Sequence, residues 1–296
     1  MKVLKFGGSS VGSVESVKLV IEIVEESINN QEKPVVVVSA FQGTTNNLVL
    51  AARKASIGDL SYVNDLTQII ENHEETAGNL VTGPELIHVN DAIVNYKQDL
   101  DKILYGVFLL RELTPRTLDH LLSFGELLSS MIIAEAFISR GIKSSVADAR
   151  KFIKTDSRFG NAHVLFSQTN KLIREYFAES IELQIVAGFI SSNAGNETTT
   201  LGRGGSDYTA AIIGAALNAE EIQIWTDVDG VLSADPRIVK IALPISELSF
   251  DEALEMSYFG AKVIYPPTIR PARLLGIPIV IKNTFNKSFP GTRITA

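Results

Sequence analysis

The sequence contains no cysteine, so the protein can form no disulfide, use no thiol nucleophile and bind no zinc through sulfur. It has only four histidines, and their spacing matches no metal-binding motif, so no metal ligands are predicted. Acidic side chains outnumber basic ones by 34 to 27, which disfavours a nucleic-acid-binding surface because phosphate backbones require a basic face. No run of about 18 uninterrupted apolar residues is present, so no membrane span is predicted. We therefore expect a cytoplasmic protein that binds neither nucleic acid nor membrane.

The chain has 296 residues, of which 45% are apolar and 21% charged, as in ordinary globular enzymes. Short β-branched runs alternate with longer stretches of helical period, which is typical of an α/β domain with a mostly parallel sheet. A single large domain with two lobes is predicted, the second lobe beginning near residue 200. The predicted strands cover residues 2–6, 34–38, 144–147, 184–187, 223–225 and 278–281.

Helical periodicity predicts a helix after the first strand and a helix-rich middle, roughly residues 45–140. Ser249 and Glu252 are spaced as a capping box, which predicts a helix over about 250–257. The final segment, residues 289–293, is interpreted as an exit from the domain. Further helices are predicted near residues 167–178 and 207–217.

The run KFGGSS, residues 5–10, is the first candidate site. Paired glycines after a strand let backbone N–H groups approach an anion, and the helix that follows adds its positive N-terminal end. Lys5 would bring a point charge to the same place. The alternative is a tight strand-to-helix turn with a surface lysine. The run is not a Walker A loop, since no G-x-x-x-x-G-K-[ST] occurs in the chain.

The run GRGGSD, residues 202–207, is the second candidate. Three glycines around Arg203 suggest a loop in which amides and a guanidinium face an anionic ligand. Asp207 is equally explained as a helix cap or a partner for the helix dipole. The spacing fails the dinucleotide fingerprint, which would need glycine at position 207, so a dehydrogenase is disfavoured.

The run WTDVDG, residues 225–230, follows an apolar strand and is the third candidate. Ligands of open α/β sheets bind beyond the carboxyl ends of the strands. Asp227 and Asp229 could therefore bind a ribose, an ammonium or a metal. They could equally form an Asx turn that ends the strand. No histidine is paired with Ser39 or Ser206, so neither is predicted to be a hydrolase nucleophile.

Taken in order, these motifs resemble the amino-acid kinase family and, within it, the aspartate kinases. The resemblance covers essentially the whole chain and is closest to the kinase part of bifunctional aspartokinase–homoserine dehydrogenases. It also rests on Ser39 to Asn46, Phe124-Gly125-Glu126, Asp235-Pro236-Arg237 and Gly260 to Ile264.

The resemblance implies a three-layer αβα sandwich in which residues of about 1–200 bind aspartate and residues 201–296 bind ATP with Mg²⁺. The implied reaction phosphorylates the side-chain carboxylate of L-aspartate to 4-phospho-L-aspartate, the first step toward lysine, threonine and methionine. The family's regulatory (ACT) domains, and the dehydrogenase domain of bifunctional members, are expected beyond this segment. The family also raises the option of a homodimer, whose interface the regulatory domains often build.

The resemblance assigns roles to individual residues. Lys5 and Lys262 would contact the transferring phosphoryl group, and Asp207 would orient the two lysines. Arg203 would bind the aspartate α-carboxylate and Glu126 its ammonium. The remaining implied substrate residues are Ser39, Ala40, Thr45, Phe189, Gly204, Gly205 and Ser206. The remaining implied nucleotide residues are Gly7, Gly8, Ser9, Thr226, Asp227, Leu232, Arg237 and Val263.

Two departures from the family pattern concern the nucleotide. Leu232 lies where members commonly have a tyrosine, and Tyr265-Pro266-Pro267 replaces the common His-Pro-basic sequence. The alternatives are a kinase of another small acid, such as glutamate or N-acetylglutamate, and a non-catalytic module that binds ATP or aspartate. Arg203 with Glu126 suits a substrate with a free ammonium and so disfavours N-acetylglutamate.

Overall fold

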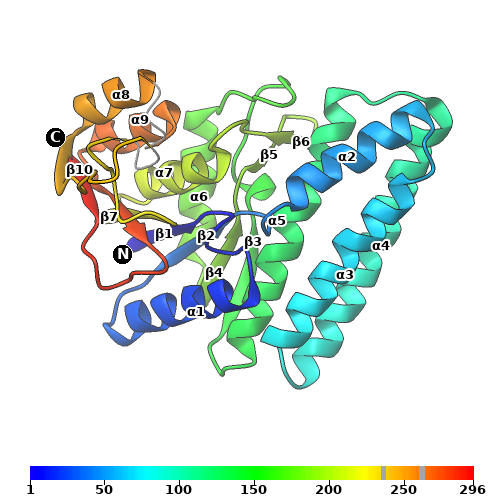
Figure 1. Cartoon of the computed structure of the whole chain (residues 1–296), viewed down its shortest axis with the longest axis horizontal. Coiled ribbons are helices and arrows are strands. Elements are labelled where there is room, and N and C mark those ends of the chain that lie inside the picture. The colour runs from blue at the N-terminus through cyan, green and yellow to red at the C-terminus, as the bar shows by residue number, and fades with distance from the viewer. Residues whose placement is uncertain (235–237, 260–263) are drawn as a thin grey trace.

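An eight-stranded sheet forms the centre of the protein in the computed structural model, which describes residues 1–234, 238–259 and 264–296 (Figure 1). Neighbouring strands run parallel except β9 and β10, which are antiparallel. Two further strands, β5 (Ile190–Ser192) and β6 (Thr198–Thr200), form a small hairpin. In spatial order the sheet comprises β3 (Ser144–Asp148), β4 (Leu183–Ala187), β2 (Val35–Val38), β1 (Lys2–Phe6), β7 (Glu221–Thr226), β9 (Ile279–Asn283), β10 (Thr292–Thr295) and β8 (Glu247–Ser249).

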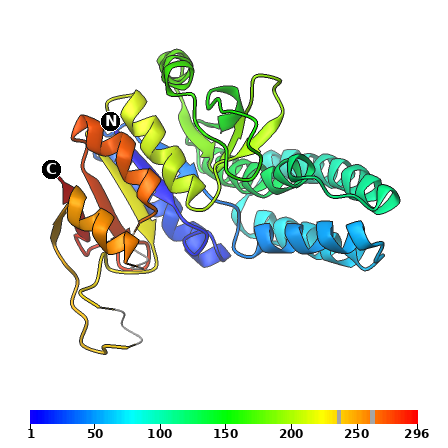
Figure 2. The same ribbon diagram turned by 90° about the horizontal axis from the view of Figure 1, so that it is seen from above.

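Helices cover both faces of the sheet (Figures 1 and 2). Leu4 and Phe6 of β1 pack in one buried cluster with α1 to α5, whereas Val3 packs in a second cluster with α6 to α9. The predicted three-layer αβα sandwich is therefore confirmed. The helices are α1 (Val14–Asn29), α2 (Thr44–Ile57), α3 (Tyr62–Leu80), α4 (Pro84–Leu110), α5 (Pro115–Ile138), α6 (Phe166–Ala178), α7 (Gly205–Ala216), α8 (Phe250–Tyr258) and α9 (Pro266–Leu275).

Local sequence explains where these elements begin. All four valines of β2 are buried, as expected for a strand covered on both faces. Helix α1 starts at a capping box of Ser13 and Ser16, and the predicted box of Ser249 and Glu252 starts α8. Helix α5 begins with Pro115 at its first position, where a missing N–H costs nothing. The helix-rich middle of the chain consists of α2 to α5.

The interpretation of residues 289–293 as an exit from the domain is wrong. Residues 292–295 form β10, which inserts between β9 and β8. Thr292 and Ile294 are fully buried there. The Thr292 hydroxyl accepts a hydrogen bond from the Val231 amide at 2.7 Å and donates one to the Ile245 carbonyl. The strand thus completes the sheet and ties down the segment after β7.

Helix α5 is a core helix. Among the described residues it is the one helix whose length and apolar composition would suit a membrane span, yet 89% of its most apolar window is buried inside the protein. It packs against α4, α2, β3 and β4. Its polar side chains are therefore placed within the molecule, and two of them, Asp119 and Glu126, bear on the site described below.

Candidate active site

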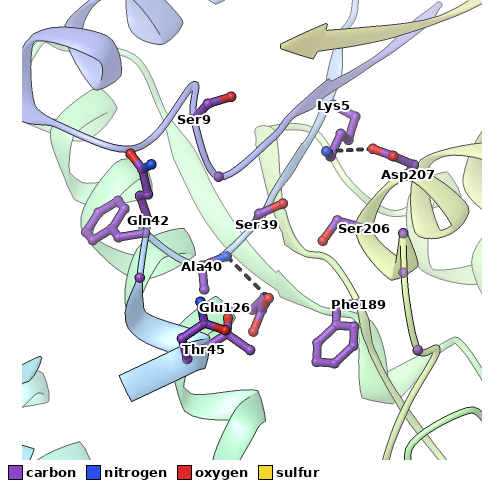
Figure 3. Close-up of a pocket in the computed structure, with 17 residues that line it drawn as sticks. Lys5, Ser9, Ser39, Ala40, Gln42, Thr45, Glu126, Phe189, Ser206 and Asp207 are labelled. Carbon is purple, nitrogen blue, oxygen red and sulfur yellow. Dashed lines mark hydrogen bonds and ion pairs between the residues drawn. The ribbon is translucent and has the colours of Figure 1, made fainter. Parts of the chain in front are cut away.

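The carboxyl ends of β1, β2 and β4 meet at one cavity of about 380 Å³ (Figure 3). The Ser39 amide donates to the Phe6 carbonyl at 3.2 Å, and the Gly188 amide donates to the Val38 carbonyl at 3.0 Å. These bonds hold the three strand ends side by side, where ligands of open α/β sheets bind. The first turns of α2 and α7 face the same cavity. Its lining consists of Lys5, Gly8, Ser9, Ser39, Ala40, Phe41, Gln42, Gly43, Thr45, Asn46, Glu126, Phe189, Gly202, Gly204, Gly205, Ser206 and Asp207.

Lys5 and Asp207 form an ion pair in this cavity (Figure 3). Lys5 lies on β1 and is 7% exposed, and Asp207 lies in the first turn of α7. Lys5 Nζ is 2.5 Å from Asp207 Oδ1. Gly7 makes room for the ammonium, because a Cβ at that position would lie 3.2 Å from Nζ. The Lys5 ammonium is therefore almost completely buried at the edge of the cavity, and the ion pair with Asp207 fixes its position.

The glycine turn after β1 lies between the sheet and the cavity. Gly8 and Ser9 line the cavity, as a phosphate-binding turn requires. The Gly7 amide instead donates to the Trp225 carbonyl at 3.1 Å, which joins the turn to β7. Its assignment as a phosphate donor stays a prediction, and Gly8 is the better placed of the two.

Glu126 enters the cavity from α5 and is 4% exposed. Its Oε1 accepts a hydrogen bond from the Ala40 amide at 3.3 Å, while Oε2 has no partner among the described residues. Burial raises the pKa of Glu126 to about 8. A ligand ammonium beside this carboxylate would supply both a hydrogen-bond donor and the missing positive charge.

Gly125 lets α5 approach the loop between β2 and α2. A Cβ added to Gly125 would lie 2.9 Å from the Ala40 Cβ and 3.3 Å from Thr44 Cγ2. The Ser129 hydroxyl donates to the Ser39 carbonyl at 2.8 Å, one turn further along the helix. Gly125 and Ser129 therefore determine how closely the β2–α2 loop packs against α5 beside Glu126.

Most predicted substrate residues converge on the cavity. Four neighbours to which the sequence assigned no role, Phe41, Gln42, Gly43 and Asn46, line it as well. All of them lie within the family motif from Ser39 to Asn46, which connects β2 to α2. Their position in that motif could have predicted that they line the cavity. The predicted substrate residues that line it are Ser39, Ala40, Thr45, Glu126, Phe189, Gly204, Gly205 and Ser206.

Phe189 and Gly205 pack against each other at the start of α7. A Cβ on Gly205 would lie 2.6 Å from the Phe189 ring, so only glycine fits. Phe189 itself has φ +67°, which costs about 1–3 kcal/mol for a residue with a side chain. The Phe189 amide donates a hydrogen bond to the Thr209 hydroxyl at 3.0 Å, which stabilises this backbone conformation. Arg203, in contrast, is exposed and lies outside the cavity lining, although both its neighbours belong to it.

Three other predicted nucleotide residues, Thr226, Asp227 and Leu232, lie further along the sheet edge, at or after the end of β7. Thr226 is half-buried, and its hydroxyl donates to the exposed Asp227 at 3.1 Å. Leu232 is half-buried and bridges to Pro244. None of these three lines the cavity. The predicted contacts of Arg237, Lys262 and Val263 lie outside the described residues.

The Asp229 side chain is hydrogen-bonded to β9 and to the segment that follows it. It accepts hydrogen bonds from Asn283 Nδ2 at 2.8 Å and Asn286 Nδ2 at 3.0 Å. The Val231 amide, which an Asx turn at Asp229 would bond, donates to the Thr292 hydroxyl instead, so these contacts do not form the predicted Asx turn. Within the described part of the chain the Asp227 side chain is bonded only to the neighbouring Thr226 hydroxyl, and Asp227 remains a candidate for a ligand.

A buried lysine and a glycine turn at a strand end of a parallel α/β sheet suit the binding of a small anionic ligand. The chain belongs to the amino acid kinase family, whose sequence model matches residues 1–283. It is 42% identical to Aspartokinase 1, chloroplastic, of Arabidopsis thaliana, over 99% of this chain and 52% of that protein. It is 37% identical to the bifunctional aspartokinase/homoserine dehydrogenase 2 of Zea mays, over 98% of this chain and 32% of that protein.

Solved aspartokinase structures share the fold along the whole chain. E. coli aspartokinase III in complex with lysine and aspartate superposes with a TM-score of 0.90 at 33% identity, covering 100% of this chain and 64% of that one. The same enzyme in complex with aspartate and ADP gives a TM-score of 0.88 at 34% identity. The chain thus spans about half the length of its aspartokinase relative and a third of its bifunctional relative.

Proposed function

We propose that the protein is the kinase domain of an aspartate kinase, which transfers the γ-phosphoryl group of ATP to the side-chain carboxylate of L-aspartate. The observation that carries the proposal is the cavity in which the Lys5–Asp207 pair faces Glu126. The relatives named above are aspartokinases, and one solved neighbour binds aspartate and ADP. A nucleotide as the phosphoryl donor agrees with these relatives and with the ADP in that structure.

The substrate itself supplies the nucleophile. A carboxylate at neutral pH is already deprotonated, so the reaction needs no general base and no serine or cysteine of the protein. The protein must instead hold two anions in line and neutralise the charge on the transferring group. Lys5 suits that task because its ammonium is buried, fixed by Asp207 and close to the glycine turn.

Aspartate would lie between Glu126 and the start of α7. Its ammonium would contact Glu126, whose Oε2 has no partner among the described residues. Its α-carboxylate would face Arg203 and the amides of Gly204 and Ser206, because the Gly205 amide is bonded to the Gly202 carbonyl. Arg203 is exposed, so we propose that its side chain turns toward the cavity when aspartate binds. The side-chain carboxylate would then point to Lys5.

ATP would occupy the sheet edge at β7, with its γ-phosphate at Lys5 and its nucleoside near Thr226 and Asp227. We further propose Lys262 as the second cation and Arg237, Leu232 and Val263 as nucleotide contacts. Mg²⁺ would enter with ATP, because it is held mainly by phosphate oxygens and water in such sites and supplies charge neutralisation there. The division into an aspartate lobe of about 1–200 and an ATP lobe of 201–296 belongs to the same proposal.

We also propose that the complete protein carries regulatory domains, since the relatives are longer, and that a homodimer forms through them. A dehydrogenase domain is proposed only by likeness to the bifunctional relatives. Cytoplasmic location stays a prediction.

The test is ADP release from Mg·ATP with L-aspartate, L-glutamate or N-acetyl-L-glutamate as the acceptor. Turnover with aspartate and at least tenfold less with glutamate supports the proposal, since one methylene is worth about 1–3 kcal/mol in a fitted pocket. Turnover with glutamate instead would assign a related kinase. Tight binding of ATP and aspartate with no turnover, in the chain and in a longer protein that includes the following domains, would favour the non-catalytic module.

A further inference from the structure

Asp119 is a second buried carboxylate on α5, two helical turns before Glu126. Its residue exposure is 1%, and it does not line the cavity. A buried carboxylate is costly unless its oxygens are hydrogen-bonded, so its partners indicate what it does. Those partners, Gly160 and Thr200, lie next to the loop that contains Arg203.

Both Asp119 oxygens accept hydrogen bonds. Oδ2 accepts from the Gly160 amide at 2.8 Å and from the Thr200 amide at 2.9 Å. Oδ1 accepts from the Thr200 hydroxyl at 2.9 Å. One side chain therefore joins the loop before α6 to the end of β6. The Ala162 amide donates to the Thr200 carbonyl at 2.9 Å and reinforces the same junction.

The junction supports Gly202 directly. A Cβ on Gly202 would lie 2.7 Å from Asn161 Oδ1 and 3.2 Å from the Gly160 carbonyl oxygen. Gly202 has φ +72°, and its carbonyl accepts from the Gly205 amide at 3.0 Å, which opens α7. The backbone on either side of Arg203 is thus packed against the segment that Asp119 holds.

We propose that Asp119 is a positioning residue that sets where the Gly202–Ser206 loop stands relative to Glu126. The inference rests on the proposed function, because it assigns this loop to the α-carboxylate of aspartate. Helix α5 then fixes both ends of the substrate: Glu126 acts on the ammonium, and Asp119 acts through Gly160 and Thr200 on the carboxylate loop. A displacement of about 1 Å in such a loop is enough to lower productive binding strongly.

Kinetics of Asp119→Ala, Asp119→Asn and Thr200→Val test the proposal. We expect Asp119→Ala to raise KM for aspartate about tenfold or more while KM for ATP changes about twofold or less. Asp119→Asn should stay within about threefold of the parent. Its carbonyl oxygen can accept from both amides while its NH₂ donates to the Thr200 hydroxyl. Thr200→Val removes one of the three bonds and should give an intermediate KM for aspartate.

Leu104→Ala is the matched control for stability. Leu104 is fully buried on α4 in the core cluster, away from this junction, and its truncation lowers Tm by leaving a cavity. It should leave both KM values unchanged. If Asp119→Ala changes KM for aspartate no more than Leu104→Ala does, or raises both KM values equally, the positioning role is wrong.

Amide hydrogen exchange gives a readout that does not need activity. Asp119→Ala should speed exchange at Gly160 and across residues 200–205 by about tenfold or more, and Asp119→Asn should not. Unchanged exchange there in a folded Asp119→Ala protein contradicts the proposal even if the parent turns nothing over. An inactive parent with the expected exchange pattern leaves the mechanical role of Asp119 supported, and the activity of the longer protein then decides the proposed function. If Asp119→Ala does not fold, Thr200→Val decides both readouts.

Discussion

Lys5 Nζ lies 2.5 Å from Asp207 Oδ1, so the end of β1 and the first turn of α7 are joined by an ion pair inside the cavity. The two residues come from the two lobes that the sequence predicts. Asp207 therefore orients the Lys5 ammonium before a phosphate group binds to it.

Replacing Lys5 by methionine should abolish phosphoryl transfer. Removing one preorganised donor to a developing charge typically lowers kcat by about 10²–10³. The side chain keeps its length, so the circular dichroism spectrum should stay that of the parent. Lys2→Met on the same strand is the control, because Lys2 pairs with Glu32 outside the cavity and should retain activity. Loss of fold in Lys5→Met, or parental activity, would count against the role of Lys5.

Replacing Arg203 by alanine should weaken aspartate binding far more than ATP binding. A bidentate guanidinium–carboxylate contact contributes about 1.5–3 kcal/mol, which corresponds to an increase in Kd of about 10–100-fold. Calorimetric titration of both ligands measures the split. Arg53→Ala, which removes an exposed arginine of α2, should change neither affinity. An equal loss of affinity for aspartate and for ATP would mean that Arg203 contacts the nucleotide or stabilises the fold instead.

Glu126 should make aspartate binding depend on pH. Burial raises its pKa to about 8, so without ligand the carboxyl holds a proton at pH 7 and must release it when the substrate ammonium binds. Affinity for aspartate should therefore rise from pH 6 to pH 8, and binding at pH 7 should release a proton to the buffer. Glu126→Gln should bind aspartate weakly at every pH in that range. Glu74→Gln, on the exposed face of α3, should behave as the parent.

The same carboxyl should affect stability in the absence of ligand. Between the ordinary pKa of 4.5 and about 8 the folded state keeps a proton that the unfolded state has lost, so the free energy of unfolding falls as pH rises through this window. Each pKa unit corresponds to about 1.4 kcal/mol. Glu126→Gln should therefore gain stability relative to the parent at pH 8 and not at pH 4. Urea unfolding at both pH values measures this, and a constant difference would show that Glu126 ionises normally.

Two glycine-to-alanine changes should have opposite signs. Gly125→Ala places a Cβ 2.9 Å from the Ala40 Cβ, so the β2–α2 loop must shift, with a cost of about 1–3 kcal/mol and a higher KM for aspartate. Gly106→Ala, inside α4, meets no described atom within 4 Å and should raise stability by about 0.5–1 kcal/mol. Thermal unfolding of both variants is the measurement. Stabilisation by Gly125→Ala would refute the close approach of α5 to the loop.

The sequence predicted the parts of the fold whose signals are local. A run of four valines favours a strand covered on both faces, and Gly8, in the turn after β1, lines the cavity. Glu126 was identified from its family motif, and the structure brings it to the same cavity as Lys5.

The missed features depend on partners far along the chain. β10 is a four-residue segment after Pro290-Gly291, and it forms a strand because its backbone pairs with β8 on one side and β9 on the other. Asp119 looks like any acidic residue near a helix start, and its importance emerges only through Gly160 and Thr200. The exposure of Arg203 was equally invisible, since a glycine-rich loop does not indicate which way a side chain points.

The central claim is tested most directly by trapping the product of Mg·ATP and L-aspartate with hydroxylamine and identifying the hydroxamate. We predict aspartate β-hydroxamate, formed in step with ADP release and lost in Lys5→Met. The α-hydroxamate, or ADP release without any hydroxamate, would contradict transfer to the side-chain carboxylate.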